Sequence, residues 1–249
     1  MARINDRNQL SGSMGKYTFC TTGTGQIVRS KSSLTANRFR HDKAFAGSRA
    51  HAAEFGRASS AARLLRQTLE PLHELLPAQM ISGKMSAAFD KVIKSDTLHV
   101  KGERQLADGD LSLLKGFEWN TRYSLYDALH ITPAVDGNIP EKKFFVTIPS
   151  FVPDKKVTAP AGATHFRIVS CTSVLMLLQN CAAMDHRQTA LLPLNNKATG
   201  IITLQHSMEN ACGEVMILTT GIVFYKQSAA GIIQPMKEGA LCLMAAGKL

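Results

Sequence analysis

The chain has 249 residues, of which 45% are hydrophobic and 19% charged, so it is long and apolar enough to fold and is not a disordered chain. Its five cysteines are widely spaced without a C-x-x-C pair, which indicates neither a disulfide framework nor a zinc site. The net charge is +10, and residues 1–66 hold most of it, with twelve lysines and arginines against three acids.

The first predicted element is a basic arm, residues 1–46, which is poor in large aliphatic side chains. Within it, two short β-prone runs at 16–21 and 26–31 flank a glycine-containing turn at 22–25, which predicts a hairpin. An isolated hairpin is only marginally stable in water. We therefore expect the arm to be ordered by a neighbouring subunit or by nucleic acid.

A helical segment, residues 47–115, is predicted next. An apolar stripe at spacings of three and four indicates a helix that ends near Pro71; its members are Phe55, Ala58, Ala62, Leu65 and Leu69. The opposite side of this helix is basic. A second helix is expected over 82–94, and a short helical turn after Asp110, which is a suitable N-cap.

Short β-prone runs separated by Pro, Gly and Asn fill the remaining domain, residues 116–249. The predicted strands are Phe117–Asn120, Ala128–Ala134, Phe144–Ile148, His165–Cys171, Ile201–His206, Val215–Tyr225 and Ala240–Met244. Many short strands at this spacing favour a sandwich over a sheet of βαβ units. The expected fold is α+β and mainly β: an antiparallel β-sandwich or barrel-like body, preceded by an extended basic arm with a hairpin and two helices.

Two of these runs, Val215–Tyr225 and 174–178, are apolar on both faces, whereas a sheet with one wet face should alternate. Two explanations remain open at this point. The strands are central and covered by the helices, or their outer face docks another subunit.

No recognised catalytic or cofactor motif is present, so we expect neither an enzyme nor a bound cofactor or small-molecule substrate. A base and nucleophile pair of His206 and Cys212 is a chance combination among eight histidines and five cysteines. Residues 185–187 (Asp-His-Arg) are expected in a solvated polar loop, and 108–110 in a turn that leads into a helix.

The N-terminus lacks a secretory signal and no apolar run reaches about 18 residues, which predicts no membrane span. We expect synthesis in the cytoplasm, with release only by lysis or by a dedicated export system.

The basic residues suggest two functions of different classes. The first is a non-enzymatic structural protein that assembles with copies of itself into a particle, tube or phage-like coat through the arm. The second is a nucleic-acid-binding protein whose arm and first helix contact phosphates. In either case the candidate contact residues are Arg29, Lys31, Arg38, Arg40, Arg49, Arg57 and Arg63.

Several stretches resemble an uncharacterised protein family common in Bacteroidota. They are 15–19 (GKYTF), 28–31 (VRSK), 45–49 (FAGSR) and 54–66 (EFGRASSAARLLR) near the N-terminus, then 148–151, 161–167 and 221–225 in the β-rich half. The similarity spans most of the chain. It implies a bacterial source and a β-rich C-terminal half, and it carries neither an activity nor site residues.

Overall fold

The computed structural model describes residues 3–4, 10–31, 34–73, 81–120 and 122–249. Its contacts divide the chain into two compact units, the N-terminal unit (Met1–Arg49) and the body (Ala50–Leu249). All described strand pairs are antiparallel, and more residues lie in strands than in helices, which confirms a mainly β fold with a small helical part. None of the described helices has the length and apolar composition that crossing a membrane requires.

A four-stranded sheet, here the N-terminal sheet, forms most of the N-terminal unit. Its strands follow one another in chain order: β1 (Arg3–Ile4), β2 (Leu10–Met14), β3 (Tyr17–Thr22) and β4 (Gly25–Ser30). The pair of β3 and β4 confirms the predicted hairpin. Gly25 starts β4 with a φ of 134°, which glycine adopts without strain. Two short elements follow, α1 (Ala36–His41) and the 3-10 turn η1 (Lys43–Phe45).

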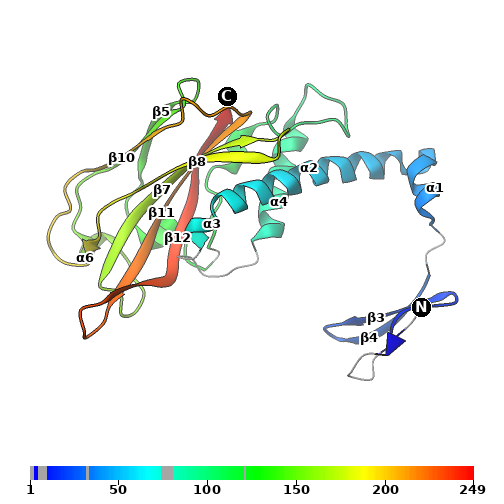
Figure 1. Cartoon of the computed structure of the whole chain (residues 1–249), viewed down its shortest axis with the longest axis horizontal. Coiled ribbons are helices and arrows are strands. Elements are labelled where there is room, and N and C mark those ends of the chain that lie inside the picture. Colours follow the sequence, from blue (N-terminus) through cyan, green and yellow to red (C-terminus); the bar gives the residue numbers. More distant parts are fainter. Residues whose placement is uncertain (1–2, 5–9, 32–33, 74–80, 121) are drawn as a thin grey trace. The chain divides into compact units, whose positions relative to one another are not determined.

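The body contains two antiparallel sheets (Figure 1). The large sheet has the order β12 (Ile233–Lys248), β11 (Val215–Gln227), β7 (His165–Met176) and β8 (Cys181–Gln188), with β9 (Leu192–Pro193) also paired to β7. The small sheet has the order β10 (Ile202–Ser207), β6 (Lys143–Ile148) and β5 (Ala134–Asn138).

Helices occupy mainly the first half of the chain. They are α2 (Ala46–Thr68), α3 (Glu70–His73), α4 (Ser82–Ser95), η2 (Leu111–Leu114), α5 (Leu125–Ala128) and α6 (Pro153–Lys156). The predicted second helix is therefore confirmed as α4. Asp110 accepts a hydrogen bond from the Ser112 N–H and begins η2, as its capping chemistry predicts.

The large sheet lies between two hydrophobic cores. On β11, Val215, Ile217 and Val223 belong to the core shared with α2 and α4, while the alternate residues Met216 and Leu218 belong to the core shared with the small sheet. Successive side chains of a strand point to opposite faces, so this central strand is apolar throughout. Both of its faces are thus covered by the same chain, which decides between the two explanations for the run Val215–Tyr225. In the run 174–178, Val174 and Leu175 are buried in the two cores, whereas Leu178 lies in the turn after β7 and is 89% exposed. The small and large sheets form the predicted sandwich, with helices as a third layer.

Five of the seven predicted strands share most of their residues with observed ones, in β6, β7, β10, β11 and β12. The predicted strand Ala128–Ala134 is wrong. Ser124 and Asp127 form a reciprocal capping box that starts α5 at Leu125, and strand β5 begins only at Ala134. The predicted strand Phe117–Asn120 is reduced to one isolated bridge, between Glu118 and Cys242.

One residue of the predicted helical stripe is misplaced. Phe55 is 46% exposed, whereas Ala58, Ala62, Leu65 and Leu69 are buried. The inward position one turn earlier is taken by Glu54, whose side chain is buried because it binds a neighbouring loop. A specific polar contact therefore replaces the hydrophobic one expected from the spacing.

Candidate functional site

The N-terminal sheet has one apolar face. Met14 is the register partner of Tyr17, and Phe19 is the partner of Val28, so these four side chains project from the same side. Met14 is 60% exposed, and Tyr17 and Val28 are each 55% exposed. Large apolar side chains clustered on one open sheet face are characteristic of a contact surface.

The opposite face of this sheet is mixed: it carries hydroxyl side chains and Arg29, together with the register partners Cys20 and Ile27. Ser13, Thr18 and Arg29 are register partners across β2, β3 and β4. The hydroxyl oxygens of Ser13 and Thr18 lie 3.2 Å apart, which places both on this side. Arg29 is exposed, and its guanidinium makes no hydrogen bond or ion pair with any residue of the described ranges.

The N-terminal unit has no core of its own. Among its described residues, 3–4, 10–31 and 34–49, none is buried. Ordering each residue costs about 1–2 kcal/mol of backbone entropy, which a folded unit offsets chiefly by removing apolar surface from water. A single open sheet removes little, so the unit's own described residues offset little of this cost.

Two arginines of the N-terminal unit serve its local structure. Arg38 donates to the Asp42 carboxylate at 3.2 Å, and its guanidinium lies 6.0 Å from the centre of the Phe45 ring. Arg49 donates to the carbonyl oxygens of Phe39 and Asp42 at 2.7 and 2.9 Å. A hydrogen bond from the Ala44 N–H, followed by the one from Arg38, lowers the pKa of Asp42.

On the body, Arg57 is likewise bound within the chain. Its guanidinium donates to the carbonyl oxygens of Gly102 and Arg104 at 2.6 and 2.8 Å. Glu54, one turn earlier on α2, accepts from the Gly102 N–H at 2.7 Å. Together these side chains fasten the loop over 96–110 to α2, so Arg57 has a structural role whatever else it contacts.

Arg63 lies on a groove of about 600 Å³ between α2 and the turn that joins β7 to β8. Small side chains of α2 form part of its lining, and Leu178 in the turn is 89% exposed. Like Arg29, Lys31 and Arg40, Arg63 is exposed and has no side-chain partner among the described residues. Within the described ranges, four of the seven predicted contact residues therefore keep an unpaired charge, and three are engaged inside the chain.

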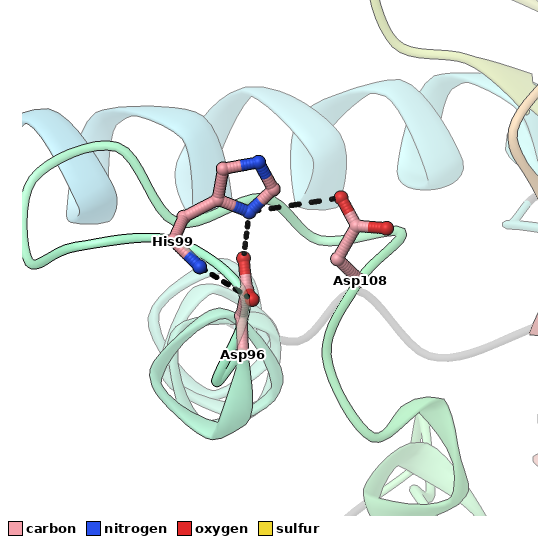
Figure 2. A group of neighbouring side chains, drawn as sticks. All are labelled: Asp96, His99 and Asp108. Carbon is pink, nitrogen blue, oxygen red and sulfur yellow. Dashed lines mark hydrogen bonds and ion pairs between the residues drawn. The ribbon is translucent and has the colours of Figure 1, made fainter.

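Asp96, His99 and Asp108 form a cluster in the loop after α4 (Figure 2). One ligand atom from each lies within 4.8 Å of the others, which is a spacing that could hold a metal ion. The side chain of Asp96 is fully enclosed, and its oxygens accept from the backbone N–H groups of Leu98, His99 and Gln105. The His99 ring contributes a fourth contact, at 2.8 Å from Nδ1 to Oδ2.

These contacts explain the cluster without a metal. Burial alone would raise the pKa of Asp96, but the hydrogen bonds from Gln105, His99 and Leu98 outweigh it and lower the pKa to about 2. Asp108 is already paired with the Lys248 ammonium at 2.5 Å. The carboxylate of Asp96 therefore fixes the conformation of this loop through its hydrogen bonds to the backbone.

A second polar cluster crosses the interior of the sandwich. His206 on β10 places Nδ1 3.0 Å from Oδ2 of Asp185 on β8, and Nε2 2.9 Å from the Ser170 hydroxyl on β7. The Ser170 hydroxyl also lies 3.3 Å from that of Thr220 on β11. Arg187 binds both oxygens of the Asp185 carboxylate, at 3.0 and 3.1 Å.

Serine, histidine and aspartate are connected here in the order found in hydrolases. Ser170 and His206 nevertheless have no exposed surface, so the hydroxyl cannot meet a substrate in this conformation. Burial lowers the pKa of His206, and the nearby Asp185 opposes this only in part. A neutral ring that donates through Nδ1 and accepts through Nε2 satisfies both partners, which makes this cluster a polar link between the sheets.

Sequence reasoning missed this cluster. Residues 185–187 lie in strand β8 and not in a solvated loop, which corrects the prediction. His206 binds Asp185 and Ser170, while Cys212 is an exposed free cysteine. The only sequence signal was the alternation of β10, where Ile202, Leu204 and His206 are the inward residues.

Comparison of the chain with family models, with curated proteins and with solved structures gives no match. The resemblance to a Bacteroidota family therefore stays a prediction, and function is argued from the geometry alone.

Proposed function

We propose that this protein is a non-enzymatic structural subunit that assembles with copies of itself through its N-terminal unit. The observation that carries the proposal is the N-terminal sheet, which has an apolar face and no buried residue in the described part of its unit. A neighbouring subunit would supply the apolar contact that the unit lacks.

The N-terminal sheet also has an edge, as the sheets of the body do at β5, β8 and β10. At β12, the carbonyl oxygens of Leu241 and Leu243 accept from the N–H groups of Trp119 and Gly116, so the 116–119 segment covers this edge of the large sheet from Leu241 to Leu243. In the N-terminal sheet, β4 pairs with β3 alone among the described strands. An edge strand of this kind can also extend the sheet of a neighbour.

Removing residues 1–45 tests the proposal, because the remaining chain keeps α2, both sheets and both cores. We expect the full chain to form oligomers whose size rises with protein concentration, and the truncated chain to stay monomeric with its two-sheet fold intact. Sedimentation velocity and circular dichroism measure the two properties, and negative-stain images show whether the oligomers are regular. A truncated chain that still assembles fully contradicts the proposal.

Nucleic-acid binding is the second candidate, and the free charges of Arg29, Lys31, Arg40 and Arg63 favour it. Phosphate contacts release counterions, so each adds roughly one unit to the slope of log affinity against log salt. Protein purified with nuclease and high salt would be titrated with single-stranded DNA and RNA at several salt concentrations. Charge reversal at Arg29 and Arg40 should then weaken binding more than charge reversal at Arg57, whose guanidinium is already bound.

A further inference from the structure

We infer that the apolar face of the N-terminal sheet stacks on the same face of a second copy, in a contact with two-fold symmetry. The inference rests on the proposed function and names the surface through which that assembly starts. It differs from strand addition, because it uses the face of the sheet and leaves its edges free.

The distribution of charge on the sheet favours a second copy as the occupant. The N-terminal unit carries nine lysines and arginines against two acids, so two copies repel each other unless their cations point apart. Met14, Tyr17, Phe19 and Val28 are uncharged, and Arg29 projects from the opposite side. Face-to-face stacking therefore joins the neutral surfaces and directs this arginine outwards into water.

A two-fold contact would also cover the open apolar face of the sheet. The same patch serves both partners, so an apolar face meets an apolar face without a second specialised surface. Two stacked sheets lie about 10 Å apart and interdigitate their inner side chains, which is the layer architecture of a sandwich. Each N-terminal unit would acquire in this way the buried layer that its described residues lack.

The size of the face determines how strong this contact can be. Strands spaced about 4.8 Å apart with a rise of about 3.3 Å per residue give a face on the order of 300 Å² per copy. The total is then below the roughly 1,200–2,000 Å² of stable specific interfaces. The contact alone is weak, so the monomer–dimer equilibrium should shift over the micromolar range of protein concentration.

Site-directed cross-linking in the full chain tests the stacking. Cys20, Cys181 and Cys212 are first replaced by serine, because they are not buried. Single cysteines are then placed at Tyr17→Cys or Val28→Cys on the apolar face. The matched controls are the neighbouring Thr18→Cys and Arg29→Cys on the opposite face. A short bifunctional maleimide is added above and below the concentration at which the chain associates.

We expect the apolar-face cysteines to give at least tenfold more covalent dimer than their neighbours, and only at the higher concentration. Equal yields from both faces, or dimer from the basic face alone, overturn the inference. A chain that associates in sedimentation without cross-linking at Tyr17→Cys or Val28→Cys overturns the stacking and leaves the proposed function standing. A chain that is monomeric at every concentration overturns both.

A charge substitution provides an independent measurement. Val28→Asp would bring two carboxylates together at the centre of the stacked face, whereas Thr18→Asp adds the same charge on the other side. We expect Val28→Asp to raise the dimer dissociation constant at least tenfold, and Thr18→Asp to change it less than threefold. Equal effects of the two variants contradict the inference, because they would show that the face does not matter.

Discussion

His206 joins the two sheets of the body at a point where hydrophobic packing would otherwise be continuous. Its ring is fully enclosed, yet both nitrogens have partners, Asp185 on one side and Ser170 on the other. Buried polar groups are tolerated when they are fully hydrogen-bonded, and they then fix one alignment of the elements that carry them. The link therefore sets the position of β10 relative to β7 and β8.

His206 should also make the folded body less stable in acid. Since burial lowers the pKa of His206 below its ordinary value of 6.5, the unfolded chain takes up this proton at a higher pH than the folded body. The stability that depends on the neutral ring is fully present above pH 6.5 and decreases as the pH falls towards the folded pKa. We expect a lower urea midpoint at about pH 5 than at about pH 7.5.

Fluorescence of Trp119, the only tryptophan and a buried residue, would follow this unfolding. In His206→Gln, the amide keeps one donor and one acceptor but does not titrate, so the difference between the two pH values should shrink. A wild-type midpoint that does not change with pH contradicts the prediction. His186→Gln is the control, because burial also lowers the pKa of His186 and its share must be measured separately.

Replacing Asp96 with asparagine should lower the stability of the body at neutral pH. In Asp96→Asn, an NH₂ group replaces an oxygen that accepts hydrogen bonds, and the charge is lost. We expect the free energy of unfolding to fall by about 2 kcal/mol, the typical value of a hydrogen bond to a charged group. Asp136→Asn is the control, because Asp136 is exposed on β5. A difference below about 0.5 kcal/mol between the two variants, measured by urea unfolding, would contradict the role of Asp96.

At the scale of elements, two glycines should respond in opposite ways to alanine. A Cβ at Gly221, in the middle of β11, would lie 2.2 Å from the Ala240 carbonyl oxygen of β12, so the two strands must move apart. A Cβ at Gly56 on α2 meets no atom within 4 Å. We expect Gly221→Ala to destabilise the body by about 1–3 kcal/mol and Gly56→Ala to stabilise it by up to about 1 kcal/mol. Thermal unfolding measures both variants, and equal shifts of their melting temperatures would contradict the different roles given to the two glycines.

Elements with strong local signals could be predicted from the sequence. The hairpin of β3 and β4 follows from its glycine turn, and α4 follows from its apolar spacing. Strand β8 could not be predicted, because its inward residue Asp185 is stabilised by a histidine from a distant strand. Helix α5 was missed because a one-turn helix depends on its capping box more than on periodicity.

Site residues were harder to predict than elements. Counting charges identified the basic residues but could not separate free arginines from bound ones. Arg57 is bound because backbone carbonyls of a loop 45 residues later lie beside it, which no local pattern encodes. Arg29 has no partner among the described residues, because its strand presents it to solvent on one face of the N-terminal sheet.

On the scale of the whole molecule, the body and the N-terminal unit differ in how the faces of their sheets are covered. The body covers both faces of its large sheet with its own helices and its small sheet. The N-terminal unit covers neither face of its sheet with residues of its own that are described. Cohesion of the body is thus internal, while the described residues of the N-terminal unit provide no buried core of their own.

Salt should change the two proposed activities of the full chain in opposite directions. Stacking of uncharged faces between positively charged units should strengthen as ionic strength rises, because salt screens the repulsion at distances beyond about 10 Å. Binding to nucleic acid should weaken over the same range. We therefore expect the dimer dissociation constant to fall between about 50 and 500 mM sodium chloride. Sedimentation velocity would measure it, and a dissociation constant that rises with salt would contradict the stacking.

The segment that pairs with β12 protects the body in a further way. By occupying the carbonyl oxygens of Leu241 and Leu243, the backbone of 116–119 removes a template on which stray strands could grow. Loss of this segment would expose the edge of β12 at Leu241–Leu243, where addition of another strand could begin. The edge that this segment covers belongs to β12, near the C-terminus, whereas the proposed assembly surface lies near the N-terminus.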